Sequence, residues 1–183
     1  MTSTDDLPPG IEERYLSATH SSNLRVEADR RSDADILIAM GWSAKNMGGS
    51  LMRLHSEWDG AAKRSRMSET DLLLLRAQLK SLPRALEDLA AAMAMLGMPT
   101  PHRTAGPILG YWLHQTCHLC EGRRFERVRN TPALSAMRCK ACHGVGTAGP
   151  PRFPETRRVL NLMDDCVNRA RDGIKRRLHP RIA

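Results

Sequence analysis

Four cysteines form two matching pairs in the second half of this 183-residue sequence. The first pair is Cys117-His-Leu-Cys120, and the second is Cys139-Lys-Ala-Cys142, with eighteen residues between the pairs. Two residues between cysteines allow one tight turn to direct both sulfur atoms at a metal ion, and a second such turn completes a tetrahedral thiolate site. The spacing therefore predicts one structural Zn²⁺ ion bound by Cys117, Cys120, Cys139 and Cys142.

A site made of four cysteines leaves no coordination position open for water, whereas a catalytic zinc ion normally keeps one. The chain also lacks a Gly-rich phosphate loop, a Gly-x-Ser-x-Gly elbow and a His-Glu-x-x-His motif. We therefore expect a protein that is not an enzyme and has no small-molecule substrate. A redox dithiol pair and a disulfide framework are alternative interpretations of paired cysteines. The doubled motif and the lack of an export signal favour zinc in a reducing cytoplasm.

The segment between the two pairs is predicted to be a cationic β-hairpin. Residues 123–129, Arg-Arg-Phe-Glu-Arg-Val-Arg, alternate as in a strand, and Asn130-Thr-Pro132 is typical of a turn. Glycine follows each cysteine pair, where it permits the positive φ needed for the chain to fold around a metal. A hairpin held rigidly by zinc loses little entropy when its cations meet phosphate. The candidate DNA contacts in this hairpin are Arg123, Arg124, Arg127 and Arg129.

Positive charge is concentrated in the half of the chain that carries the cysteines. Residues 1–116 contain 13 Lys/Arg and 14 Asp/Glu, whereas residues 117–183 contain 15 Lys/Arg and 6 Asp/Glu. Four thiolates with one Zn²⁺ would remove only two positive charges from that excess. A polyanion, above all nucleic acid, is the partner class that this charge favours, and a solvated basic surface without a ligand is the alternative.

The remaining elements predict a mostly α fold: a helical core with an inserted zinc-ribbon β-hairpin and a basic C-terminal helix. Residues 1–31 are polar and are expected to be a flexible N-terminal arm. Residues 32–116 are expected to form a helical domain that makes protein contacts. Its predicted helices run from Asp33 towards Trp58 with a break near Gly49, from Asp71 to Lys80, from Arg84 to Leu96, and from Gly106 to Gln115. The break at the glycines is compatible with two short core helices or with a helix-turn-helix.

The zinc-binding hairpin is assigned to residues 117–150 and the basic C-terminal helix to residues 151–183. Pro154 is typical of the first turn of this last helix. One face of the helix is apolar and includes Cys166, which is expected to be buried; the opposite face is cationic. That face either contacts phosphates or is only solvated. Its candidate DNA contacts are Arg157, Arg158 and Lys175.

Two parts of the sequence together carry a family resemblance. They are the double knuckle Cys117-His-Leu-Cys120-Glu-Gly with Cys139-Lys-Ala-Cys142-His-Gly-Val-Gly146, and the upstream segment Asp35-Ile-Leu-Ile-Ala-Met-Gly-Trp42. Both parts resemble the late-gene antitermination protein Q family of lambda-like phages. The knuckle also occurs in DnaJ-type chaperones, and its combination with the upstream segment favours the phage family. The family is mostly helical with a zinc-bound insertion, and the resemblance makes the four cysteines its zinc ligands. After Cys142 this chain has one clear helix where the family would have a helix-turn-helix pair.

The resemblance implies a factor that binds DNA near a phage late promoter and engages bacterial RNA polymerase holoenzyme, so that the polymerase reads through terminators. Such a protein would act in the cytoplasm of the bacterial host and would have no contact with a membrane. A zinc-stabilised protein-interaction or chaperone-like module is the alternative function. A nuclease would need a further cluster of His, Asp and Glu residues that the sequence does not provide.

Overall fold

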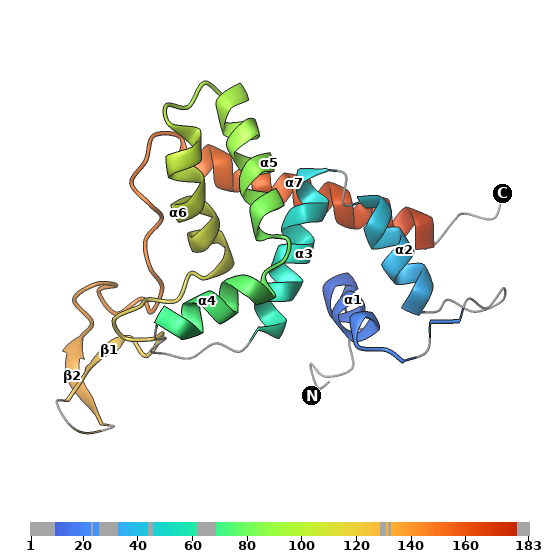
Figure 1. Ribbon diagram of the computed structural model, residues 1–183. Coiled ribbons are helices and arrows are strands. Elements are labelled where there is room, and N and C mark those ends of the chain that lie inside the picture. Colours follow the sequence, from blue (N-terminus) through green and yellow to red (C-terminus); the bar gives the residue numbers. More distant parts are fainter. Residues whose placement is uncertain are drawn as a thin grey trace, which may run out of the picture. The chain divides into compact units, whose positions relative to one another are not determined.

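The computed structural model describes residues 10–22, 24–25, 33–43, 46–61, 69–128, 131 and 133–178. These residues form mainly helices and one small antiparallel sheet (Figure 1), as the sequence predicts. The helices are α1 (Ile11–Thr19), α2 (Asp33–Ser43), α3 (Met47–Gly60), α4 (Glu69–Gln78), α5 (Leu82–Met95), α6 (Pro101–Leu113) and α7 (Thr156–Leu178), and the strands are β1 (Phe125–Arg127) and β2 (Leu134–Arg138). None of these helices combines the length and the apolar character that crossing a bilayer requires.

The chain folds as two compact units that interleave along the sequence. The first unit comprises residues 1–63, 67–89 and 161–183, and the second comprises residues 64–66 and 90–160. The predicted boundaries at residues 116/117 and 150/151 do not coincide with the limits of these units. The predicted boundaries follow changes in composition, whereas the units follow packing: α6 belongs with the cysteines, and most of α7 belongs with the N-terminal helices.

Part of the predicted flexible arm is an ordered helix in the first unit. Helix α1 begins after Gly10, whose N–H donates to the Glu13 carboxylate at 2.9 Å and so satisfies one of the free donors at the helix start. It packs against α2 and α3, and Ala18 is buried. The sequence signal is weak because a polar helix of nine residues gains its stability from packing and not from its own periodicity.

The break predicted near Gly49 lies between Ser43 and Met47, so α2 and α3 are separate helices. Their apolar residues fill the core of the first unit together with residues of α4, α5 and α7. Fully or almost fully buried members of this core are Ile36, Met40, Leu51, Met52, Leu54, Leu79, Leu89, Met163, Val167 and Ile174. Two polar contacts tie α3 to the chain around α5: the Ser50 hydroxyl donates to Asp88 at 2.9 Å, and the Ser81 hydroxyl donates to Glu57 at 2.8 Å.

In the second unit, α6 begins earlier than the predicted Gly106. Pro101 is its first residue, where the missing N–H of proline has no cost because the first N–H groups of a helix have no partner within it. Pro107 lies inside the same helix without ending it. Before α6, Gly97 ends α5 with a φ of +72°, and the N–H of Met98 donates to the carbonyl of Met93 at 3.1 Å. A glycine with positive φ directly after the last turn is a common cap of a helix.

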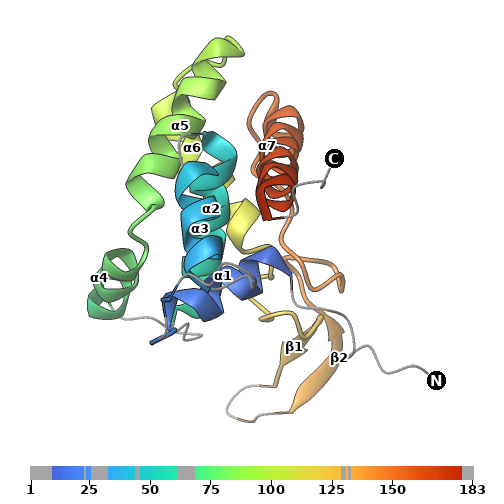
Figure 2. The same cartoon turned by 90° about the vertical axis from the view of Figure 1, so that its right-hand side faces the viewer.

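The predicted hairpin is present as β1 and β2, which pair antiparallel (Figure 2). Phe125 pairs with Arg138, and Arg127 pairs with Leu134, so β2 contains extra residues between the two pairs. Ser135 stabilises this bulge because its hydroxyl accepts the N–H of Met137 at 3.1 Å. Asn130 and Pro132 of the predicted turn, like Arg129, lie outside the described residues.

Candidate metal centre and basic surface

The four paired cysteines converge on one point in the second unit. The Sγ atoms of Cys117 and Cys139 are 3.9 Å apart, and those of Cys120 and Cys142 are 3.6 Å apart. All four sulfur atoms lie within 4.8 Å of one another, and each cysteine is at most 6% exposed. The four thiols are free, so none forms a disulfide.

This donor set fits a tetrahedral metal ion. Zn–S bonds of about 2.3 Å in tetrahedral geometry place sulfur atoms about 3.8 Å apart, close to the two distances observed here. Four sulfur donors are typical of structural zinc or of an iron–sulfur centre. The four residues could therefore hold one metal ion, and they surround it completely.

The two knuckles have the same main-chain conformation. In each of them the residue after the second cysteine has a positive φ, 51° at Glu121 and 52° at His143, and a glycine with positive φ follows. Those glycines are Gly122 at 82° and Gly144 at 88°, which confirms the predicted role of glycine at these turns. The repeated conformation aims each pair of sulfur atoms at the same point.

Main-chain hydrogen bonds join the knuckles reciprocally. The N–H of Cys117 donates to the carbonyl of Gly146 at 3.0 Å, and the N–H of Cys139 donates to the carbonyl of Arg124 at 2.9 Å. Gly146 and Arg124 occupy equivalent places, four residues after Cys142 and Cys120 respectively. The first residue of each knuckle is therefore hydrogen-bonded to the last residue of the other, so neither knuckle can form all its contacts alone.

Main-chain N–H groups also point at the sulfur atoms. The N–H of Gly146 donates to Cys142 Sγ at 3.2 Å. Burial raises the pKa of Cys142, but hydrogen bonds from the N–H groups of Gly146 and Gly144 and from neighbouring thiols outweigh it and lower the pKa to about 6. Burial dominates at Cys120 and raises its pKa to about 11, although the N–H of Arg124 opposes it. One thiolate is thus favoured within the cluster, which is the charge state that binds a metal.

The cations around the cluster differ in their partners. Glu121 pairs with Arg123 at 2.6 Å and lies 3.9 Å from Arg127, so these two predicted DNA contacts share one carboxylate. Arg158 pairs with Glu155 at 3.7 Å. By contrast, Arg124 and Arg157 form no ion pair with another described residue. Of the predicted DNA contacts in the second unit, Arg124 and Arg157 are therefore more available to an external anion than Arg123, Arg127 and Arg158.

Arg138 is a further available cation that sequence reasoning missed. It is exposed at the end of β2, and its side chain lies over Gly144, where an added Cβ would be 3.1 Å from Arg138 Cδ. The side chain of Arg124 lies similarly over Gly146. The only sequence signal for Arg138 as a DNA contact is its position directly before Cys139, because the predicted strand is the one that precedes the turn. Lys175 belongs to the first unit, so the predicted DNA contacts do not form one set within one unit.

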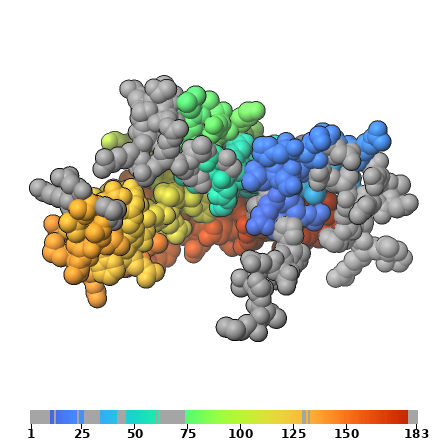
Figure 3. Space-filling model, turned by 90° about the horizontal axis from the view of Figure 1, so that it is seen from below, coloured from blue at the N-terminus to red at the C-terminus, as the bar shows by residue number. Residues whose placement is uncertain are grey.

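The segment that carries the cysteines, drawn in yellow and orange in Figure 3, also has large apolar side chains on its surface. The six large ones, with 39% to 63% of their surface exposed, are Leu119, Phe125, Val128, Leu134, Met137 and Val145. Phe125 is the cross-strand partner of Arg138, so an aromatic ring and a cation lie side by side on one face. The alternation of arginine with apolar residues in 123–129 contains the sequence signal for this face.

Comparison of the chain with protein-family models, with curated proteins and with solved structures gives no match.

Proposed function

We propose that this protein is a transcription antitermination factor of the phage Q type. It binds DNA near a late promoter and the bacterial RNA polymerase holoenzyme, and the bound polymerase then reads through terminators. Zinc on the four cysteines has a structural role, and the protein performs no chemical reaction. Its place of action is the cytoplasm of the bacterial host.

Segregation of charge between the two units is the observation that carries this proposal. The first unit contains 16 Lys/Arg and 17 Asp/Glu, whereas the second contains 12 Lys/Arg and 3 Asp/Glu. The excess of cations thus belongs entirely to the unit that holds the cysteine cluster. A nearly neutral unit suits protein contacts, and a strongly basic one suits the phosphates of DNA.

Ion pairing within the second unit also supports the proposal that this unit contacts DNA. Its three carboxylates, Glu121, Glu126 and Glu155, are each used in an ion pair with a nearby cation. Among the described residues of this unit, Arg124, Arg138 and Arg157 form no ion pair and remain available to an external anion. Arg124 and Arg138 are attached to the knuckles, where the metal and the reciprocal hydrogen bonds hold the main chain, so little ordering entropy opposes their contact with phosphate.

A transcription assay from promoter to terminator tests the proposal. Templates with and without a phage late promoter are transcribed by bacterial RNA polymerase holoenzyme, in the presence of the wild-type protein or of Cys139→Ser. We expect read-through that requires both the promoter and Cys139. Equal read-through on both templates, or none with zinc-loaded wild-type protein, would contradict the proposal.

A protein-interaction module is the second candidate function, and the six exposed apolar residues of the ribbon favour it. Apolar side chains gathered on a surface are typical of a protein-binding site. Salt distinguishes the two functions, because each phosphate contact makes log affinity fall with log salt concentration with a slope of about −0.9. An apolar protein interface responds only weakly to salt.

A further inference from the structure

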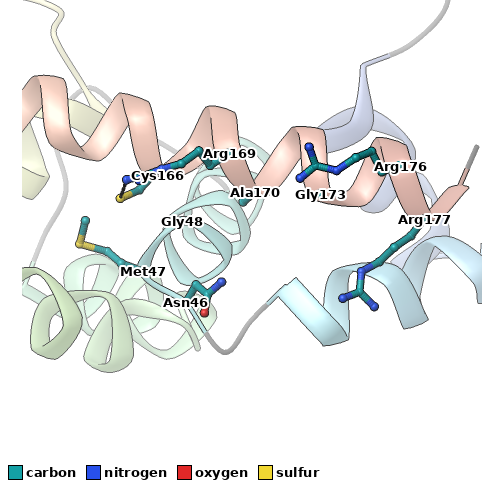
Figure 4. Close-up of a pocket in the computed structure, with 9 residues that line it drawn as sticks. All are labelled: Asn46, Met47, Gly48, Cys166, Arg169, Ala170, Gly173, Arg176 and Arg177. Carbon is teal, nitrogen blue, oxygen red and sulfur yellow. Dashed lines mark hydrogen bonds between the residues drawn. The ribbon is translucent and has the colours of Figure 1, made fainter.

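A cavity of about 420 Å³ lies in the first unit, between the start of α3 and one side of α7 (Figure 4). The start of α3 contributes Asn46, Met47 and Gly48 to its lining. Helix α7 contributes three small or medium-sized residues and three arginines: Cys166, Ala170, Gly173, Arg169, Arg176 and Arg177. Its volume is within the range of cavities that take small ligands or parts of larger ones.

Among the described residues that line the cavity, the charged ones are all arginines. Two hydrogen bonds hold the guanidinium of Arg169 in place. Its Nη2 donates to Cys166 Sγ at 3.1 Å (Figure 4), and its Nε donates to the carbonyl of Asp165 at 3.3 Å. A guanidinium has five N–H donors, so three donors of Arg169 are left for a ligand. The α7 side of the cavity therefore attracts an anion with several acceptor atoms.

The start of α3 adds main-chain donors to the same cavity. Asn46 precedes this 14-residue helix in an extended conformation, its side chain makes no capping hydrogen bond, and the first turn contains no acidic residue. The N–H groups of Gly49 and Ser50 donate to the carbonyl of Asn46, so the free donors of this turn are those of Met47 and Gly48. The first N–H groups of a helix carry partial positive charge, which favours a bound anion. Both sides of the cavity thus favour the same kind of ligand.

We infer that this cavity binds a phosphate group. The planar fork of an arginine matches pairs of phosphate oxygens, and here three arginines of α7 line the same cavity as the first turn of α3. The phosphate belongs either to a nucleic-acid backbone or to a small phosphate-bearing molecule, which offer the same group to the site. All the lining residues lie in the first unit, so this inference does not depend on the zinc ribbon or on the proposed function.

Calorimetric titration of the full-length, zinc-loaded protein tests this site with three probes: inorganic phosphate, pyrophosphate and a short DNA duplex. We expect saturable binding of pyrophosphate that Arg176→Gln weakens about tenfold, the loss typical of one hydrogen bond between charged groups. The matched control is Arg76→Gln, which removes the same charge from an exposed position on α4 of the same unit. It should change the affinity less than about twofold.

Cys166 provides a second readout that does not depend on heat of binding. It is the one free cysteine outside the metal cluster and it lines the cavity, so bound phosphate should slow alkylation of its thiol. Protection by the duplex as well as by pyrophosphate assigns the site to a nucleic-acid backbone. Protection by pyrophosphate but not by the duplex assigns it to a small phosphate compound. The inference is overturned if none of the probes binds saturably, or if the two arginine variants weaken binding equally.

Discussion

The main chains of α3 and α7 meet at Gly48 and Cys166. A Cβ atom on Gly48 would lie 2.0 Å from the carbonyl oxygen of Cys166 and 3.1 Å from the Cβ of Ala170. A carbonyl within a helix cannot move aside as the end of a long side chain can, so any side chain at this position must push the helices apart. The absence of a side chain at Gly48 therefore sets how closely these helices pack in the first unit.

Gly48→Ala should lower the free energy of unfolding by about 1–3 kcal/mol, because the added methyl group overpacks a contact between two main chains. Urea denaturation followed by circular dichroism measures the change. Gly173→Ala is the control: Gly173 lies inside α7 of the same unit, and an added Cβ would have no neighbour within 4 Å. That variant should be neutral or up to about 1 kcal/mol more stable. Equal midpoints for the two variants would contradict the close packing of α3 and α7.

Replacement of a single cluster cysteine should abolish metal binding. Cys139→Ser removes one of four converging donors and leaves the other three without a complete site, so we expect its zinc content to fall from one per chain to near zero. Thermal unfolding of the second unit should occur at a lower temperature, as should that of wild-type protein treated with a chelator. Cys166→Ser lies outside the cluster and should keep its zinc. Metal analysis that finds equal zinc in both variants would show that Cys139 is not a ligand.

Gly146→Ala should weaken metal binding without removing a ligand. Gly146 has a φ of +91°, and its added Cβ would lie 3.0 Å from the carbonyl oxygen of Gly122, so alanine strains the knuckle that donates its N–H to Cys142. Loss of supporting contacts of this kind typically weakens metal affinity about 10–100-fold. Competition with a chromogenic zinc chelator measures the affinity. Gly149→Ala, where the added Cβ has no neighbour within 4 Å, should match the wild type.

The unpaired cations should matter more for DNA than the paired ones. Arg138→Gln is expected to reduce affinity for a DNA duplex and to make the slope of log affinity against log salt less negative by about 0.9, the effect of one phosphate contact. Arg123→Gln removes the same charge from a residue already engaged by Glu121, so its effect should be smaller. Fluorescence anisotropy at several salt concentrations measures both quantities. A larger change in slope for Arg123→Gln than for Arg138→Gln would contradict the assignment of Arg138 as the phosphate contact.

The cysteine cluster and the hairpin could be predicted from sequence because their signals are local. A Cys-x-x-Cys pair and the glycine that follows it define one turn, and the repeated motif predicts the second. The glycine cap of α5 at Gly97 is local in the same way. Each of these features is decided by residues that are neighbours along the chain, so the sequence pattern contains them almost completely.

The remaining features depend on packing between distant segments and were missed or misplaced. Helix α1 lacks a strong apolar period, and contact with α2 and α3 stabilises it. Cys166 was expected to be buried, but it is only partly buried and lines the arginine-containing cavity. The availability of Arg138 and the pairing of Arg123 are set by cross-strand register and by the position of one carboxylate. No periodicity in the sequence encodes such relationships.

Because the two units interleave along the sequence, the ribosome completes their residues at different times. All the residues of the second unit, the four cysteines included, have been translated by residue 160. The first unit receives Met163, Val167 and Ile174 of its core only afterwards. Its N-terminal helices must wait for the final turns of α7, and they are the part of the nascent chain with most need of protection from aggregation.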